Sequence, residues 1–206
     1  MRVAGLAFLS LLLTSGVAQA RWAPSLLDAG DSPTRSDVRF GGEAGLGGGG
    51  AFHFSWNSDG LTVPALYVGG SWGEGAAIVV GGGVHRSWIN TPRTEARFRI
   101  AADAQIALDG GFAFRALPGL SFRFALDPKG RLRFACGVDG RMSGGFGVVE
   151  ALVVDLGLPV GLELRISKWA QVAIRGRIAV ERIAQDPPQA GFEIGIAVLG
   201  FAPRIP

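Results

Sequence analysis

The stretch TEARFRIAADAQIAL, residues 94–108, decides the fold of this chain. Successive side chains of a β-strand point to opposite faces, so a strand with one apolar face alternates with a period of two. The odd positions of the stretch hold charged, polar or small residues. The even positions from 96 onward are all apolar: Ala96, Phe98, Ile100, Ala102, Ala104, Ile106 and Leu108. This alternation predicts a strand with one apolar and one polar face.

The same even-numbered phase continues through the rest of the C-terminal half. Charges placed in the predicted strands fall on odd positions, with Glu150 and Arg182 as the exceptions. Such one-sided alternation is expected of the wall of a β-barrel. The segments that keep the phase are 112–116, 120–126, 132–138, 146–156, 160–166, 172–180 and 192–201.

Three-residue turns that end in glycine explain how the phase survives each reversal of the chain. Paired residues of an antiparallel hairpin share a face, so an odd number of loop residues keeps even positions opposite even positions. A type I turn followed by a glycine in the left-handed region meets this requirement. The predicted turns are Asp109-Gly110-Gly111, Leu117-Pro118-Gly119 and Pro128-Lys129-Gly130, which place Leu108 opposite Phe112, Ala116 opposite Leu120 and Leu126 opposite Leu132.

The N-terminal half is harder to phase. Residues 38–56 keep apolar side chains at even positions, but 61–72 and 75–89 are apolar on both faces and rich in glycine. The glycine runs 47–50 and 81–83 lack the Lys-Ser/Thr of a phosphate-binding loop, which favours strand kinks or close backbone approaches. We therefore predict an all-β, antiparallel, up-and-down barrel of about twelve strands, within a range of eight to twelve.

Composition and the N-terminus narrow the class of protein further. The 206 residues are 48% hydrophobic and 18% charged, which excludes a disordered chain. Gly accounts for 33 residues, which disfavours an all-helical fold. A net charge of +3 is too small to indicate nucleic-acid binding. Arg2, the apolar run 3–13 and Ala18-Gln19-Ala20 predict a cleaved signal peptide over residues 1–20. We expect an irregular segment over 21–37 and the barrel domain over 38–206.

Two architectures fit a one-sided series of strands. A soluble exported barrel or sandwich turns its apolar face inward, whereas a transmembrane barrel turns it toward lipid and lines its lumen with polar residues. The arginine-rich polar face and the predicted export favour the transmembrane barrel, as do four tryptophans expected at the membrane interfaces, Trp56, Trp72, Trp88 and Trp169. The predicted lumen-lining residues are Glu95, Arg97, Arg99, Asp103, Arg115, Arg123, Arg133, Glu163, Arg165, Arg175, Arg177 and Glu181.

With its leader, its meander over 95–201 and stretches such as LPVGLEL (158–164), the chain resembles the small outer-membrane β-barrel proteins of Gram-negative bacteria. The resemblance is to a class and not to one family. It implies insertion into outer-membrane lipid by the barrel-insertion machinery. Proteins of this class end in an aromatic residue that this machinery recognises, and Phe201 is the candidate here, followed by a five-residue tail.

The function predicted from these observations is a monomeric barrel that is either structural or a narrow pore. An excess of inward arginine would favour anions in such a pore. We expect no enzymatic activity, cofactor or metal, since His85 has no partner at ligand spacing. A minor alternative is a lipid-modifying hydrolase, because a 47–51 loop would bring Glu43 opposite Ser55, beside His53.

Overall fold

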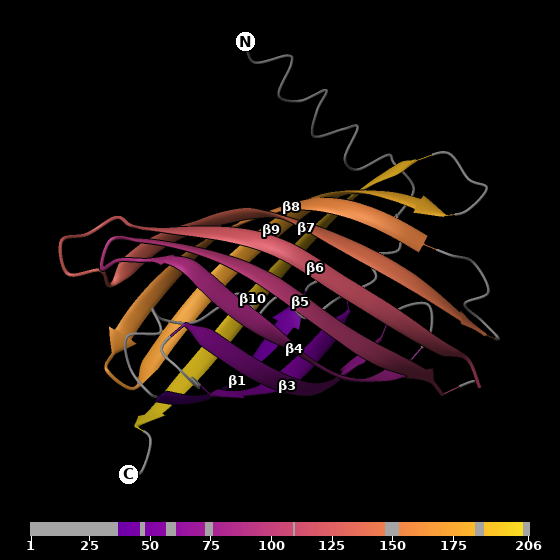
Figure 1. The fold of residues 1–206 in the computed structure, drawn as a ribbon. Coiled ribbons are helices and arrows are strands. Elements are labelled where there is room, and N and C mark those ends of the chain that lie inside the picture. Colours follow the sequence, from indigo (N-terminus) through magenta and orange to yellow (C-terminus); the bar gives the residue numbers. More distant parts are fainter. Residues whose placement is uncertain are drawn as a thin grey trace, which may run out of the picture.

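Ten antiparallel strands close into a barrel in simple chain order, with β1 hydrogen-bonded to both β2 and β10 (Figure 1). The computed structural model describes residues 37–45, 48–56, 61–72, 76–108, 110–146, 153–183 and 188–203. The predicted signal peptide and residues 21–36 of the predicted irregular segment lie outside these ranges. No helix within them has the length and apolar character needed to cross a membrane.

The strands fall into a short and a long group. The short group is β1 (Asp37–Gly45), β2 (Gly49–Trp56) and β3 (Thr62–Ser71). A membrane-crossing strand needs about 9–11 residues, so the long strands cross with residues to spare. The long group is β4 (Ala77–Asn90), β5 (Thr94–Ala107), β6 (Phe112–Ala125), β7 (Leu132–Phe146), β8 (Val153–Ser167), β9 (Ala170–Ile183) and β10 (Gln189–Pro203).

The register keeps odd residues opposite odd residues around the whole barrel. Asp103 of β5, for example, lies opposite Arg115 of β6 and Gly81 of β4. Only two irregularities occur in the described pairings, between Ser87 and Ile89 on β4 and between Arg165 and Ser167 on β8, both near strand ends. Apart from the strand ends beyond these two irregularities, the even positions of the ten strands therefore form one face, including the strands of 61–72 and 75–89 that the sequence alone did not phase.

This even face is the outer wall. Phe122 and Ile174 are 37% and 56% exposed, whereas Arg99 and Arg175 are only 4% and 7% exposed. The apolar side chains thus point away from the barrel axis and the guanidinium groups point toward it. A soluble barrel would show the opposite arrangement, so the soluble alternative does not fit. An apolar wall around a charged interior is the arrangement of a transmembrane barrel.

The count of ten, within the predicted range of eight to twelve, follows from strands that continue where we predicted breaks. The turn predicted at Leu117-Pro118-Gly119 was wrong, because β6 runs straight through it. Pro118 pairs with Ile100 of β5, while pairing with β7 lapses at this point because proline has no N–H to donate. Likewise Pro159 lies within β8, which joins the latter part of segment 146–156 to segment 160–166.

The other two predicted turns exist. At Pro128-Lys129-Gly130 the Leu126 N–H donates to the Leu132 carbonyl at 2.8 Å, and Gly130 has a φ of 64°, as predicted. The turn predicted at Asp109-Gly110-Gly111 is centred one residue earlier than predicted. Ile106, not Leu108, pairs with Phe112, so the loop keeps an odd length and the phase is unaffected.

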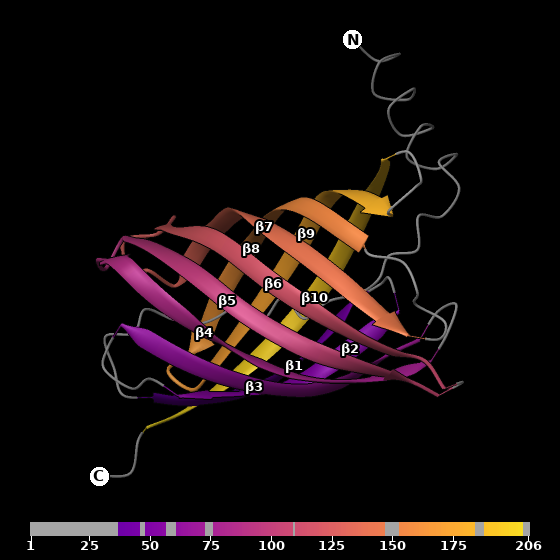
Figure 2. The same cartoon turned by 45° about the vertical axis from the view of Figure 1, so that its right-hand side comes forward.

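The start of β1 and the end of β10 lie at the same end of the barrel, as an even number of antiparallel strands requires (Figures 1 and 2). We call this the terminal end. It carries the start of β1, the end of β10 and the turns 91–93, 126–131 and 168–169. The opposite end is called the distal end.

Asp127, in the turn between β6 and β7, gives this hairpin a dependence on pH. Its carboxylate accepts a hydrogen bond from the Leu132 N–H at 2.7 Å, which lowers the pKa of the carboxyl below its usual value of 3.8. The bond therefore contributes stability above pH 3.8, and this contribution is lost as the pH falls through the lowered pKa. We expect Asp127→Asn to unfold at lower denaturant than the parent at pH 7 and at the same denaturant at pH 2. A difference that persists at pH 2 would contradict this assignment.

Candidate functional site

The barrel interior is the site at which the charged residues gather. Among the described residues, eight buried arginines point inward, all at odd positions, and they are accompanied by seven carboxylates. The arginines are Arg39, Arg97, Arg99, Arg115, Arg123, Arg141, Arg175 and Arg177. The carboxylates are Glu43, Glu95, Asp103, Asp139, Asp155, Glu163 and Glu193.

Glu163 of β8 is the centre of one cluster in the half nearer the terminal end. Arg123 Nε donates to its Oε1 at 3.1 Å, Arg175 donates to the same oxygen, and Gln171 Nε2 donates to Oε2 at 3.3 Å. Arg123 also reaches Glu95 of β5 at 3.4 Å, and Glu95 is paired with Arg97. Arg123 and Glu163 are each only 1% exposed as side chains. We call these residues, with Ser87, which donates to Glu95 at 2.9 Å, the Glu163 cluster.

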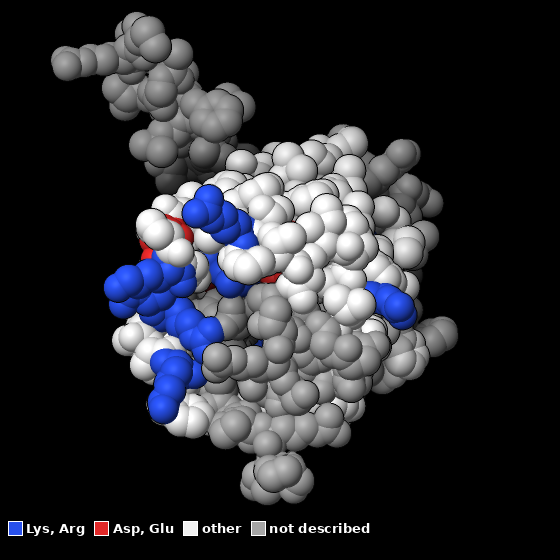
Figure 3. Space-filling view, turned by 60° about the vertical axis from the view of Figure 1, so that its left-hand side comes forward, with Lys and Arg blue, Asp and Glu red and all other residues white. Residues whose placement is uncertain are grey.

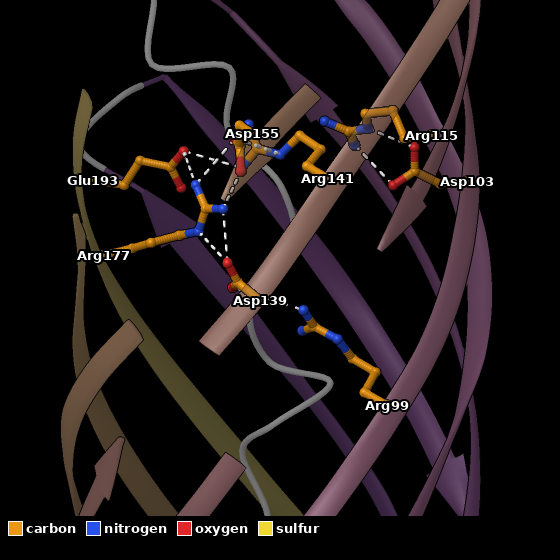
Figure 4. Close-up of polar contacts among 8 residues, drawn as sticks. All are labelled: Arg99, Asp103, Arg115, Asp139, Arg141, Asp155, Arg177 and Glu193. Atoms are coloured by element: carbon orange, nitrogen blue, oxygen red, sulfur yellow. Dashed lines mark hydrogen bonds and ion pairs between the residues drawn. The ribbon is translucent and has the colours of Figure 1, made fainter. Parts of the chain in front are cut away.

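A second cluster lies around Asp155 of β8 (Figure 4). The Arg177 guanidinium of β9 donates to both oxygens of Asp155 and, through Nε, to Asp139 of β7 at 2.8 Å. Arg141 Nη2 donates to Glu193 of β10 at 3.0 Å and its Nε lies 3.5 Å from Asp155. These five residues, with Arg99, whose Nη2 lies 3.8 Å from Asp139, form the Asp155 cluster.

A third contact joins three strands of the wall, β3, β5 and β6. Arg115 of β6 makes two parallel hydrogen bonds to Asp103 of β5, at 2.7 and 2.8 Å (Figure 4). The Tyr67 hydroxyl of β3 donates to the same carboxylate at 2.8 Å. Strand β4 lies between β3 and β5 and has a glycine, Gly81, at the crossing point. A Cβ at this position would lie 2.5 Å from Tyr67 Cζ. The glycine therefore lets the tyrosine ring lie across β4 to reach Asp103.

Glycine has the same role beneath an arginine. A Cβ at Gly157 of β8 would lie 2.4 Å from the Arg177 guanidinium. Because Gly157 has no side chain, Arg177 can lie flat against the wall and reach Asp155 and Asp139. The predicted close approach at the 81–83 run is likewise found, since a Cβ at Gly83 would lie 2.5 Å from Ala101 Cβ.

Several ion pairs of the two larger clusters join strands that are not neighbours. Arg123 and Glu163 link β6 to β8, Arg177 and Asp139 link β9 to β7, and Arg141 and Glu193 link β7 to β10. Side chains that bridge in this way reach across the intervening strands on the inner face of the barrel. The two clusters place paired charges in the interior, where they compensate one another in a place with little water.

The structure places most predicted lumen residues inside, but two lie at the terminal end and one is not described in full. Arg133 and Arg165 are half-buried at the mouth and donate to turn carbonyls, Gly130 O for the first and Ser167 O and Lys168 O for the second. Glu181 lies on β9 with its backbone opposite Asp155, and its side chain is outside the described part. Nine of the predicted residues are buried inside: Glu95, Arg97, Arg99, Asp103, Arg115, Arg123, Glu163, Arg175 and Arg177.

Sequence reasoning did not single out Arg39, Asp139, Arg141 or Asp155 as lumen residues. Asp139 and Arg141 lie beyond the predicted end of their strand at 138, whereas β7 continues to Phe146. All four occupy odd positions, so the phase of the even face contained the signal that would have identified them.

Three of the four predicted interfacial tryptophans lie near the terminal end. Trp56 ends β2 at this end, Trp88 lies two residues before the end of β4, and Trp169 is in the turn between β8 and β9. Trp72 lies just after β3, at the distal end. Trp88, Trp169 and Trp72 are each about half exposed, and Trp88 packs edge-on against Phe122 on the outer wall.

The structure does not assemble the predicted hydrolase residues. His53 Nε2 lies 3.6 Å from Glu43 Oε1, so the acid and the base are close. The predicted register was wrong, however, because β2 begins at Gly49 and places Ala51 opposite Glu43, while Ser55 lies opposite Arg39. Within the described ranges, no group of three or more His, Cys, Asp or Glu residues is arranged to hold a metal ion.

The closed ten-stranded barrel, the apolar wall and the charged lumen together define a transmembrane β-barrel of the outer-membrane type. No protein-family model matches the sequence, and no curated protein matches it. Among solved structures, the chain is similar to a bacterial polysaccharide outer membrane secretin, with a TM-score of 0.50 and 8% identity. The alignment covers 77% of this chain and 57% of that one, so the chain spans less than two thirds of that protein.

The chain also aligns with OmpT, an outer membrane protein of Vibrio cholerae. For the in-vitro folded protein the TM-score is 0.41 at 8% identity, over 87% of this chain and 71% of that one. For a mutant of OmpT that lacks loop L8 the TM-score is 0.42 at 8% identity, over 92% and 71%.

Proposed function

We propose that this protein is a structural barrel of the outer membrane whose lumen is closed to solutes by its arginine–carboxylate clusters. The observation that carries the proposal is the set of ion pairs between non-neighbouring strands. Arg123–Glu163 and Arg141–Glu193 each connect strands two or more places apart, and the arginines and Glu163 are almost completely buried. A water-filled channel would leave such side chains accessible.

The proposed location in the cell follows from the class of barrel that the fold defines. The apolar wall needs a lipid environment, and the predicted signal peptide over residues 1–20 supports export. We propose that the chain is a monomer inserted into outer-membrane lipid by the barrel-insertion machinery, which would recognise Phe201. The backbone of Phe201 lies in β10 opposite Arg39.

Planar-bilayer recording tests the closed lumen. The full-length protein is expected to show no steady conductance, because no continuous water path passes the two clusters. Arg123→Ala combined with Glu163→Ala removes a crossing pair without leaving either partner alone, and is expected to produce small steady current steps. The matched control is Phe122→Ala, which deletes a large side chain from the outer wall and should leave the bilayer silent.

A narrow anion-favouring pore is the second candidate, because the described interior has one more arginine than carboxylates and further basic residues stand at the terminal end. Steady conductance by the parent protein, with a reversal potential in a salt gradient that indicates anion preference, would establish this function and contradict a closed lumen.

A further inference from the structure

Arg86 is an unusual residue on the outer wall. It occupies an even, outward-facing position of β4 between Val84 and Trp88 and is exposed. Its strand neighbours on either side are Thr62 of β3 and Phe98 of β5. Of the side chains described within the strands, it is the only charged one that faces outward. Its guanidinium makes no hydrogen bond or ion pair within the described part of the chain.

The depth of Arg86 indicates what it contacts. It lies four residues before the end of β4 at Asn90, or about 9 Å below that end for a strand tilted by 45°. A charge on the lipid-facing wall is costly at the membrane centre, and the cost falls toward the interface. From this depth the long arginine side chain can place its guanidinium at the level of the lipid headgroups. Trp88, a residue type that favours this level, stands beside it on the same face.

The three described turns at the terminal end are basic. The exposed cations of these turns are Arg93, Lys129, Arg131 and Lys168, and Asp127 is the sole acidic residue in the three turns. The Ala125 N–H donates to the Arg93 carbonyl and the Arg165 N–H donates to the Arg131 carbonyl. The β4–β5 turn is therefore next to β6, and Arg131 is next to β8. Figure 3 shows Lys and Arg gathered along one side of this mouth, with few acidic residues beside them.

One of these cations also lies at an interfacial tryptophan. The Lys168 Nζ is 4.9 Å from the centre of the Trp169 ring, a distance at which the ring attracts the ammonium group. Cations and amphipathic rings thus share one level of the barrel, a combination that favours the level of the lipid headgroups.

We propose that the terminal end binds the phosphate groups of anionic lipids, with Arg86 as the contact on the wall and Arg93, Lys129, Arg131 and Lys168 as the contacts on the rim. A soluble polyanion would reach the rim but not Arg86, which faces sideways into the bilayer. Arginine suits the task because its planar fork donates two hydrogen bonds to a phosphate. This inference rests on the membrane placement proposed above.

Lipid retention tests the proposal. The full chain is inserted into vesicles of equal parts phosphatidylglycerol and phosphatidylcholine and extracted in mild detergent, and the retained lipids are quantified by mass spectrometry. We expect phosphatidylglycerol to be enriched about tenfold, the effect of one charge-assisted hydrogen bond. Arg86→Gln should lower this enrichment, and Arg86→Lys, which keeps the charge but lacks the planar fork, should lower it less.

Further arms separate the outcomes. Heat-modifiable migration on a gel shows whether each variant has folded. If Arg86→Gln does not fold, the double variant Lys129→Gln and Arg131→Gln, which changes only a turn, still tests the proposal and should lower the enrichment. Equal retention of the two lipids by the inserted parent would overturn this inference alone, whereas failure to insert would overturn the membrane placement. Enrichment abolished by inorganic phosphate, but not by sodium chloride of equal ionic strength, would identify a free-phosphate site and also overturn the proposal.

Discussion

Glu163→Ala is expected to lower the free energy of unfolding of the barrel by about 3–5 kcal/mol, the range observed when one partner of a buried ion pair is removed. Glu163 accepts hydrogen bonds from Arg123, Arg175 and Gln171. Without it, two guanidinium groups remain in a place where little water can solvate them. The measurement is reversible unfolding in urea of the protein folded into vesicles, followed by tryptophan fluorescence.

Arg165→Ala is the matched control on the same strand. Arg165 is half-buried at the mouth, and the hydrogen bonds that identify its place go to the carbonyls of Ser167 and Lys168, so we expect its loss to cost about 1 kcal/mol. Arg123→Ala in the Glu163→Ala background should recover part of the stability, because it removes one of the two buried guanidinium groups that lose the Glu163 carboxylate. Equal losses for Glu163→Ala and Arg165→Ala would mean that water screens the Glu163 cluster, and the lumen would then be open.

Gly81→Ala is expected to lower the free energy of unfolding by about 3 kcal/mol. The added Cβ would lie 2.5 Å from Asp103 Cβ, 2.5 Å from Tyr67 Cζ and 2.6 Å from the Ala102 carbonyl oxygen. Two of these atoms are fixed by the backbone and the third belongs to a rigid ring, so the strand or the ring must shift. Overpacking of this kind costs about 1–3 kcal/mol, and displacement of the Tyr67 hydroxyl adds the loss of a hydrogen bond to a charged group.

Gly195→Ala provides the comparison, because Gly195 also occupies an odd position and the nearest atom to an added Cβ is the Ala44 carbonyl oxygen at 3.5 Å. We expect it to be close to neutral in the same urea titration. Tyr67→Phe keeps the ring and removes only the hydroxyl, so it should have a smaller effect than Gly81→Ala. If Gly81→Ala and Gly195→Ala lower the free energy of unfolding equally, the close approach of Tyr67 to β4 does not contribute to the stability of the barrel.

The agreement between sequence and structure differs from one strand to another. Residues 94–107 form β5 almost as the alternation predicts, because a strand with one apolar face has a single way to turn in a bilayer. The break predicted at Leu117-Pro118-Gly119 failed because proline and glycine in this barrel are tolerated inside a strand, where the unpaired edge of Pro118 faces β7. Strands such as β4, with Gly81, Gly82 and Gly83 in its middle, could not be phased until their partners were known.

The predicted site shows the same division. The odd phase alone indicated that Arg97, Arg123 and Glu163 share a face, since that follows from the geometry of a strand. It did not indicate that Arg123 meets Glu163, 40 residues away on a strand that is not its neighbour. The Glu43 and Ser55 prediction failed for the same reason, because the register of β1 with β2 depends on where the glycine-rich loop ends.

By itself, the amino-acid sequence determined which side chains of the C-terminal half share a face, because alternation along a strand and odd-length turns are local properties. The exposures in the closed barrel showed that the apolar face points outward. Only the tertiary structure decided how many strands close the barrel and which arginine pairs with which carboxylate. Those contacts depend on the registers of ten strands acting together and on glycines such as Gly81 and Gly157, which matter only because another strand sends a side chain across them.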